Sequence, residues 1–183
     1  MAKSVFIISG EKKTGKTFFL QKLISILSES EYELRGFYAQ NDEITDSYHI
    51  INIRTHEKIL LMTRVSQPDK RPIHFQINES AIPVGTDWLN QKENPGNTIF
   101  VLDEIGYFEL HGMVWHQLFS NVLNLSDTII FTTKTKNLPQ IIEHWKIQPE
   151  IIFHSDDFAN PNNASKRIIQ VLEHHKKSLK QKV

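Results

Sequence analysis

Short apolar runs alternate with segments of helical periodicity along most of the chain. The run over residues 3 to 9 predicts a first strand, and residues 34 to 40 predict a second. The segment between them carries apolar residues at the i, i+3 and i+4 spacing of a helix that faces a core. These residues are Phe19, Leu20, Leu23, Ile24 and Leu27. The first strand is apolar through its centre, as expected of a parallel strand that is buried on both faces.

The C-terminal half continues this alternation. Buried strands are expected over residues 98 to 104, 128 to 133 and 151 to 154, and helices over residues 112 to 125, 138 to 145 and 163 to about 180. In the helix over 112 to 125, one face gathers Trp115, Leu118, Phe119, Val122 and Leu125, which we expect to point inward. Alternating strands and helices at both ends of the chain predict a three-layer α/β fold with a mostly parallel sheet.

The middle of the chain has a different pattern. Two β-like runs, residues 48 to 53 and 59 to 63, are separated by five polar residues, which is typical of a hairpin. A short strand over 73 to 78 and a helix over 81 to 91 follow. We therefore expect one domain over residues 1–183, with an antiparallel β-hairpin extension over 41–78 and a C-terminal helix and basic tail over 164–183.

Composition narrows the class of protein. The 183 residues are 39% hydrophobic, and 21 basic residues balance 21 acidic ones, which argues against a dedicated nucleic-acid binder. The chain has no cysteine, so disulfides and cysteine-based zinc sites are excluded. Its first residues resemble no signal peptide, and no apolar stretch is long enough to cross a bilayer. These features predict a cytoplasmic protein that does not enter membranes.

The first strand leads directly into Gly10–Thr17, which matches the phosphate-loop pattern GxxxxGK[ST] between a strand and a helix. The glycines let successive N–H groups point at phosphate oxygens, at the positive end of the new helix. We expect Lys16 to reach the β- and γ-phosphates and to be catalytic, and the hydroxyl of Thr17 to bind Mg²⁺. The full set of expected nucleotide-binding residues is Gly10, Glu11, Lys12, Lys13, Thr14, Gly15, Lys16, Thr17 and Phe18.

Two adjacent acids end the strand over 98 to 104. Asp103 and Glu104 lie where open α/β sheets bind their ligands, at the carboxyl end of a buried strand. We expect Asp103 to hold Mg²⁺, directly or through a water. Glu104 is the candidate base that deprotonates the attacking water.

With these residues in place, the chain resembles the small nucleoside-triphosphatase family first described from thermophiles, whose members also occur in animals. The resemblance rests on the phosphate loop, on Arg35-Gly36-Phe37-Tyr38, and above all on the DEIG-x-x-EL sequence within Val101–Leu110. The order of elements matches from about residue 3 to 172. The family's phosphate loop falls on Gly10–Thr17, and its acidic pair falls on Asp103 and Glu104.

The resemblance implies slow, Mg²⁺-dependent hydrolysis of ATP, GTP or other nucleoside triphosphates, with loose base selectivity. The chain departs from the family at two positions of the loop. Lys13 stands where the family usually has glycine, and Phe18 stands where it often has a second threonine. Phosphate binding should survive, because only the outer glycines belong to the minimal pattern.

Further positive charge on the transferring phosphoryl group would speed the reaction, and the sequence does not choose its source. The candidates are Arg54, Arg64, Lys70, Arg71, Lys134 and Lys136. Two other functions use the same parts. A nucleotide or small-molecule kinase would need an acceptor pocket, for which only residues 41 to 78 have room. A nucleotide-bound adaptor without turnover would dock a protein partner through the hairpin.

Overall fold

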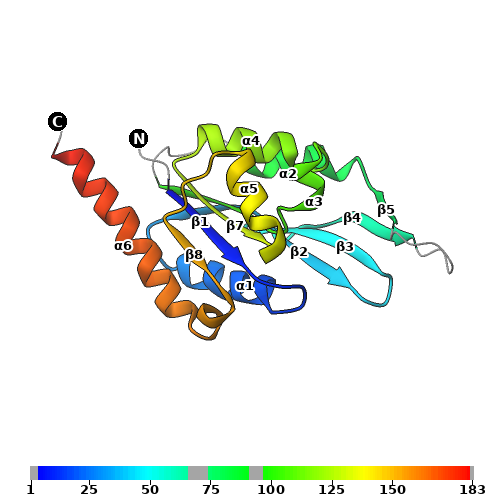
Figure 1. Ribbon diagram of the computed structural model, residues 1–183, viewed down its shortest axis with the longest axis horizontal. Helices are drawn as coiled ribbons and strands as arrows, with labels where there is room; N and C mark the ends of the chain where they lie inside the picture. Colours follow the sequence, from blue (N-terminus) through cyan, green and yellow to red (C-terminus); the bar gives the residue numbers. More distant parts are fainter. Residues whose placement is uncertain (1–3, 66–73, 91–96, 182–183) are drawn as a thin grey trace.

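The computed structural model describes residues 4–65, 74–90 and 97–181 and shows one eight-stranded sheet between two layers of helices (Figure 1). The strands are β1 (Ser4–Ser9), β2 (Glu33–Asp42), β3 (Ser47–Asn52), β4 (Lys58–Val65), β5 (His74–Ile77), β6 (Thr98–Leu102), β7 (Thr128–Thr133) and β8 (Ile151–Phe153). The helices are α1 (Lys16–Leu27), α2 (Ala81–Asn90), α3 (Tyr107–Leu110), α4 (His116–Leu125), α5 (Leu138–His144) and α6 (Pro161–Lys180), with 3-10 turns η1 (Thr135–Asn137) and η2 (Ser155–Ala159). Across the described ranges, every helix is too short or too polar to span a membrane.

The strand order is β5-β4-β3-β2-β6-β7-β1-β8. Neighbouring strands pair in parallel along β2-β6-β7-β1-β8. They pair antiparallel along β5-β4-β3-β2, so β2 belongs to both parts. The expected three-layer fold with a parallel sheet and an antiparallel segment is therefore confirmed. Because β7 lies between β1 and β6, the strand before the phosphate loop and the strand before the acidic pair are not neighbours.

Each face of the sheet has its own apolar core. In β1, Phe6 and Ile8 pack with α1 and α6, whereas Val5 and Ile7 pack on the opposite face with α2, α4 and α5. All four side chains are nearly or fully buried, which explains the uninterrupted apolar run in the sequence. Figure 1 shows the two helical layers on opposite sides of the sheet.

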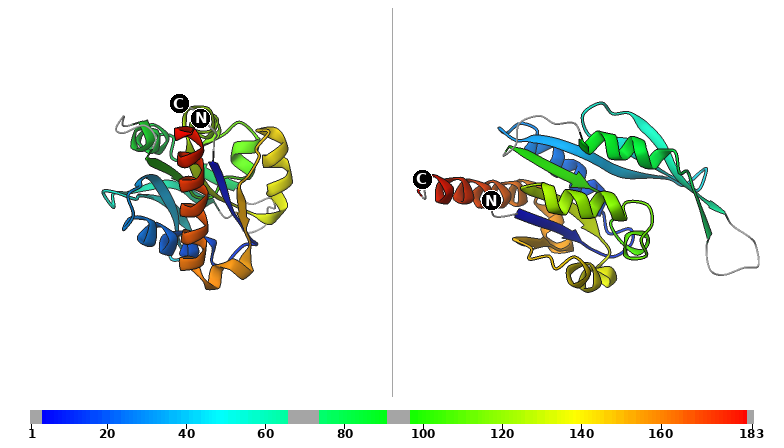
Figure 2. Two further views of the ribbon diagram at one scale, coloured as in Figure 1. Left: turned by 90° about the vertical axis from the view of Figure 1, so that its left-hand side faces the viewer. Right: turned by 90° about the horizontal axis from the view of Figure 1, so that it is seen from above.

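The antiparallel strands β3 to β5 continue the sheet outward from β2. Figure 2 shows them reaching beyond the helical layers. The expected hairpin is present as β3 and β4, and the expected short strand is β5. Residues 66–73 of the expected extension over 41–78 lie outside the described residues.

Most predicted elements begin and end within two residues of the observed ones. Residue 3, where the first predicted strand begins, and residue 91, where a predicted helix ends, lie outside the described ranges. The prediction for residues 112 to 125 is wrong in two respects. The helix begins only at His116, because Gly112 and Val114 have left-handed φ values of 75° and 49°. Leu125 is 86% exposed, and Leu123 instead contributes to the core.

Candidate active site

The phosphate loop connects β1 to α1 in a tight turn. Gly10 N–H donates to the carbonyl of Thr133 at the end of β7 (3.3 Å), which joins the loop to the sheet. Gly15 has a φ of 92° and caps the amino end of α1. The first N–H groups of a helix have no intrahelical acceptor, so the amides of Lys16, Thr17 and Phe18 are available to an anion at this end.

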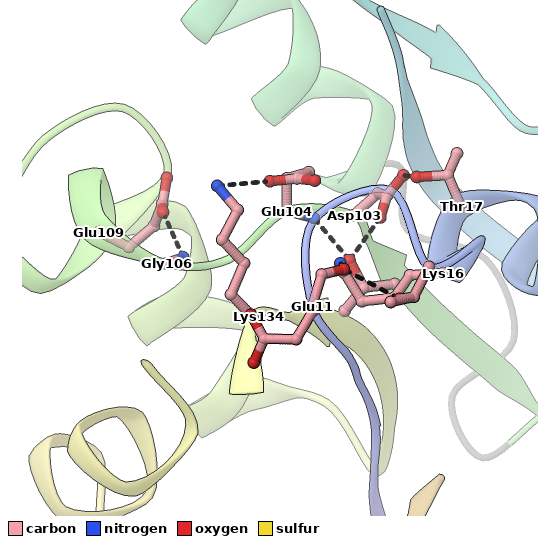
Figure 3. A network of polar contacts seen from close by, with 10 residues as sticks. Glu11, Lys16, Thr17, Asp103, Glu104, Gly106, Glu109 and Lys134 are labelled. Atoms are coloured by element: carbon pink, nitrogen blue, oxygen red, sulfur yellow. Dashed lines mark hydrogen bonds and ion pairs between the residues drawn. The ribbon is translucent and has the colours of Figure 1, made fainter. Parts of the chain in front are cut away.

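Lys16 is the buried cation of the loop. Its side chain is 5% exposed, and its Nζ donates to the carbonyl of Glu11 at 2.8 Å (Figure 3). Burial lowers the pKa of the Lys16 ammonium, while the carboxylates of Glu104 and Asp103 oppose this shift. The ammonium therefore belongs to the same electrostatic unit as the two acids.

Asp103 is almost completely buried at the end of β6, with 1% of its surface exposed. Its Oδ2 accepts hydrogen bonds from Thr17 Oγ1 (3.0 Å) and from Ala39 N–H (2.9 Å). Its Oδ1 accepts from the hydroxyl of Thr132 on β7. Burial, with a smaller contribution from the charge of Glu104, raises the pKa of Asp103 to about 6, although these three hydrogen bonds favour the ionised form.

Glu104 has a left-handed backbone, with a φ of 67°. Its N–H donates to Thr132 Oγ1 at 2.8 Å, and its carboxylate lies 3.8 Å from the ammonium of Lys134, just after β7. Both side chains are partly exposed, at 42% and 36%. The carboxylate of Glu104 is thus partly exposed next to the buried Asp103 and lies toward Lys134 (Figure 3).

The fold agrees with comparisons to known proteins. The model of a protein family described as NTPase matches residues 5–176. The chain belongs to this NTPase family.

Solved structures support the same fold. THEP1 from the hyperthermophile Aquifex aeolicus is similar with a TM-score of 0.66 and 17% identity over 92% of this chain and 99% of that one. A human cancer-related nucleoside triphosphatase is similar with a TM-score of 0.67 and 20% identity, over 94% and 98%. The comparison with curated proteins gave no significant match. The shared architecture is the P-loop NTPase fold.

The remaining loop residues of this NTPase lie around the buried Lys16. Thr14 Oγ1 donates to the carbonyl of Glu11 at 2.9 Å, which tightens the turn. Lys12 is exposed, and Lys13 lies 3.3 Å from Glu43 in an exposed ion pair of little energetic weight. Phe18 is 64% exposed, and Lys22 Nζ lies 5.4 Å from the centroid of its ring.

Among the candidate cations, the structure places Lys134 beside the acidic pair. Arg54 binds Glu33 (3.0 Å), which begins β2 at the opposite end of the parallel strands. Arg64 lies on the extension, 3.5 Å from Asp46. Lys136 lies exposed on η1, and Lys70 and Arg71 lie outside the described residues.

Three contributors were not found from the sequence. Thr132 and Ala39 bind Asp103, but nothing in their local sequence marks them, because their position depends on the order of strands. Glu109, 2% exposed, accepts hydrogen bonds from the N–H groups of Gly106 (2.7 Å) and Trp115 (3.3 Å). Its place in the DEIG-x-x-EL sequence was the available signal.

The pair of Thr17 and Asp103 fits a Mg²⁺ site. The ion accepts oxygen ligands, keeps several waters, and is usually held by one or two protein groups together with substrate phosphates. A hydroxyl 3.0 Å from a carboxylate at the phosphate loop supplies such a pair. Within residues 4–65, 74–90 and 97–181, His, Cys, Asp and Glu form no cluster of three or more suited to a metal, so a dedicated all-protein cage is not offered there.

Proposed function

We propose that this chain hydrolyses nucleoside triphosphates to diphosphate and phosphate in a Mg²⁺-dependent reaction, with loose base selectivity and ATP or GTP among its substrates. Membership of the NTPase family supports hydrolysis of nucleoside triphosphates in general. The observation that carries the proposal is the meeting of Thr17, Asp103 and Glu104 beside the phosphate loop.

The loop holds the substrate in this proposal. The amides at the start of α1 and the Lys16 ammonium bind the β- and γ-phosphates, and burial strengthens their electrostatic interaction. Thr17 and Asp103 hold Mg²⁺, which, when bound, would neutralise charge on the phosphate oxygens. Ala39 and Thr132 fix the carboxylate of Asp103 in its orientation.

Glu104 acts on the attacking water. Its backbone is fixed by the hydrogen bond to Thr132, while its carboxylate stays accessible. The carboxylate orients the water and accepts its proton as the oxygen attacks the γ-phosphorus. Lys134, 3.8 Å away, orients the Glu104 carboxylate and adds positive charge near the transferring group.

The decisive comparison is Glu104→Gln against Lys16→Ala. Glu104→Gln should lower kcat by about 10²- to 10⁴-fold, the usual contribution of a positioned base, while triphosphate affinity is retained. Lys16→Ala should lose both triphosphate binding and turnover, because it removes the loop's buried charge. Glu143→Gln on the exposed side of α5 makes the same chemical change away from the site and serves as the control.

The measurement is phosphate release together with nucleotide binding. Hydrolysis at the wild-type rate by Glu104→Gln would refute the assignment of the base. A wild-type protein that binds nucleotide but shows no turnover above background, with or without an added acceptor, would favour the adaptor function instead.

A panel of nucleotides tests the substrate range. Phosphate release from ATP, GTP, CTP and UTP should be comparable with Mg²⁺ and should stop when the ion is chelated. Strong discrimination among the four bases would contradict loose selectivity, and unchanged release in chelator would contradict the role given to Thr17 and Asp103.

A further inference from the structure

A large cavity opens beside the acidic pair, on the side of the antiparallel extension. Its volume is about 700 Å³, and both Asp103 and Glu104 line its inner end together with Lys12 and Lys134. Its outer part is bounded by β3, β4 and β5 on one side and by α3 with the segment that follows it on the other. The cavity therefore runs from the carboxylate of Glu104 into the extension.

The walls of the outer part are apolar and aromatic. They include Ile50, Leu61, Met62, Phe75, Phe108 and Trp115. Three rings form a row across the opening between the extension and α3. Tyr48 and Phe75 meet edge to face with centroids 5.8 Å apart, and Phe75 meets Phe108 in the same way at 5.9 Å. Such a wall favours a flat apolar group.

The water that hydrolysis requires would fill only a small part of this cavity. A water molecule occupies about 30 Å³ of liquid, whereas small-molecule sites measure about 300–1,000 Å³ and are mostly apolar with a few polar groups at one end. A bound triphosphate would lie along the phosphate loop and the start of α1. The apolar part of the cavity lies on the far side of Glu104, between β5 and α3, where it can hold a second molecule.

We propose that this cavity binds a second substrate, a small primary alcohol with an apolar or aromatic body, which accepts the γ-phosphoryl group in place of water. The apolar body packs against the ring row, and the hydroxyl reaches Glu104. This inference rests on the proposed function, because it uses the same loop and the same base.

The transfer is balanced without any further reactant. The alcohol oxygen forms a bond to the γ-phosphorus while the bond from that phosphorus to the β–γ bridging oxygen breaks. The bridging oxygen leaves with the electron pair as part of the nucleoside diphosphate. The hydroxyl proton passes to the carboxylate of Glu104. The products are a phosphate monoester and a nucleoside diphosphate.

The test measures how the phosphoryl group divides between water and two alcohols. The wild-type protein is incubated with γ-labelled ATP and an equal concentration of either ethanol or 2-phenylethanol, and the monoester and free phosphate are quantified. Both probes are primary alcohols, so their difference reports the phenyl ring. Burying the ring should raise the ratio of monoester to phosphate about tenfold or more over ethanol.

Two neighbouring positions on β5 provide a matched pair of variants. Ile77 lines the cavity and is partly buried, whereas Gln76 is exposed and points to the other face of the strand. Ile77→Trp should fill the cavity and reduce the 2-phenylethanol ratio to that of ethanol, while phosphate release continues. Gln76→Trp should keep the wild-type ratio. Phe75→Ala, which breaks the ring row, should also lose the preference.

The outcomes separate the two proposals. If ATP is consumed but no monoester forms, or if the two alcohols give equal ratios, the second-substrate site is refuted and hydrolysis stands. If ATP is not consumed with water alone but is consumed with 2-phenylethanol, the site is supported and the hydrolase function fails. Retention of the preference by Ile77→Trp would also refute the site.

Discussion

Two residues of the candidate site have a backbone conformation that side chains disfavour. Lys13 has a φ of 66° and Glu104 a φ of 67°. The left-handed conformation costs a non-glycine residue about 1–2 kcal/mol. At position 13 a glycine would avoid this cost. At Glu104 the strain is held by the hydrogen bond from its N–H to Thr132, and strain of this kind is common at functional sites.

We expect Lys13→Gly to be more stable than Lys12→Gly by about 1 kcal/mol. Both changes remove one positive charge and add the same freedom to the unfolded chain, but only Lys13 has a positive φ. Urea unfolding of the two variants measures the difference. Equal stabilities would mean that the loop holds no strain at Lys13.

From the sequence, residues of this site can be predicted only where a local pattern marks them. Lys16, Thr17, Asp103 and Glu104 can be predicted as site residues because a loop pattern and an acidic strand end carry local signals. The partners of Asp103 carry none, since Thr132 and Ala39 reach it from strands on either side of β6. The choice of Lys134 among six cations likewise required the fold.

The pairing of β2 with β6 depends on a single glycine. Gly36 pairs with Val101 and has a φ of 125°, and a Cβ atom built there would lie 1.9 Å from the Val101 carbonyl oxygen. No rotamer change can relieve a collision with backbone. Because β2 also carries Ala39, whose N–H binds Asp103, the same glycine helps to position the acid.

Gly36→Ala should therefore lower the free energy of unfolding by at least about 2–3 kcal/mol. Gly112→Ala is the control, because Gly112 has a φ of 75° but no atom within 4 Å of the added Cβ, so it should cost only about 1 kcal/mol. Denaturant titration measures both. Similar losses for the two variants would show that β2 and β6 separate easily.

Periodicity located the long elements and failed at the short one. The four residues of α3, Tyr107–Leu110, are too few to show a helical repeat, so the sequence predicts no helix there. The helix predicted from residue 112 is α4, which begins only at His116. Leu125 has the right spacing for the inward face, but it is the last residue of α4, where the chain turns toward β7. Tertiary position, rather than pattern, decides exposure at such ends.

The stability of the whole molecule should depend on the protonation of Glu109. Burial raises the pKa of its carboxyl from 4.5 to about 7, although the N–H donors of Gly106 and Trp115 oppose the shift. Between these two values the folded chain holds a proton that the unfolded chain has released. This contribution is fully present below about pH 4.5 and is lost as pH rises toward 7.

Glu109→Gln imitates the protonated form and should remove this dependence. The free energy of unfolding of the wild type, minus that of Glu109→Gln, should fall by roughly 1–3 kcal/mol between pH 4.5 and pH 7.5. Denaturant unfolding at several pH values measures it. The exposed Glu57, changed to Gln, controls for the loss of one carboxyl. A difference that stays constant with pH would contradict a buried, protonated Glu109.

The way β3, β4 and β5 are attached also bears on how this architecture can diversify. Among the strands of the described residues, β3 is the one that pairs with β2, and none of the three pairs with β1 or β6, which precede the loop and the acids. Insertions, deletions or grafted hairpins in this extension would change the shape of the cavity next to Glu104 while leaving the phosphate loop and the acidic pair in place. Changes confined to these strands would therefore alter which second molecule the cavity can hold, while the phosphate loop and the acidic pair stay the same.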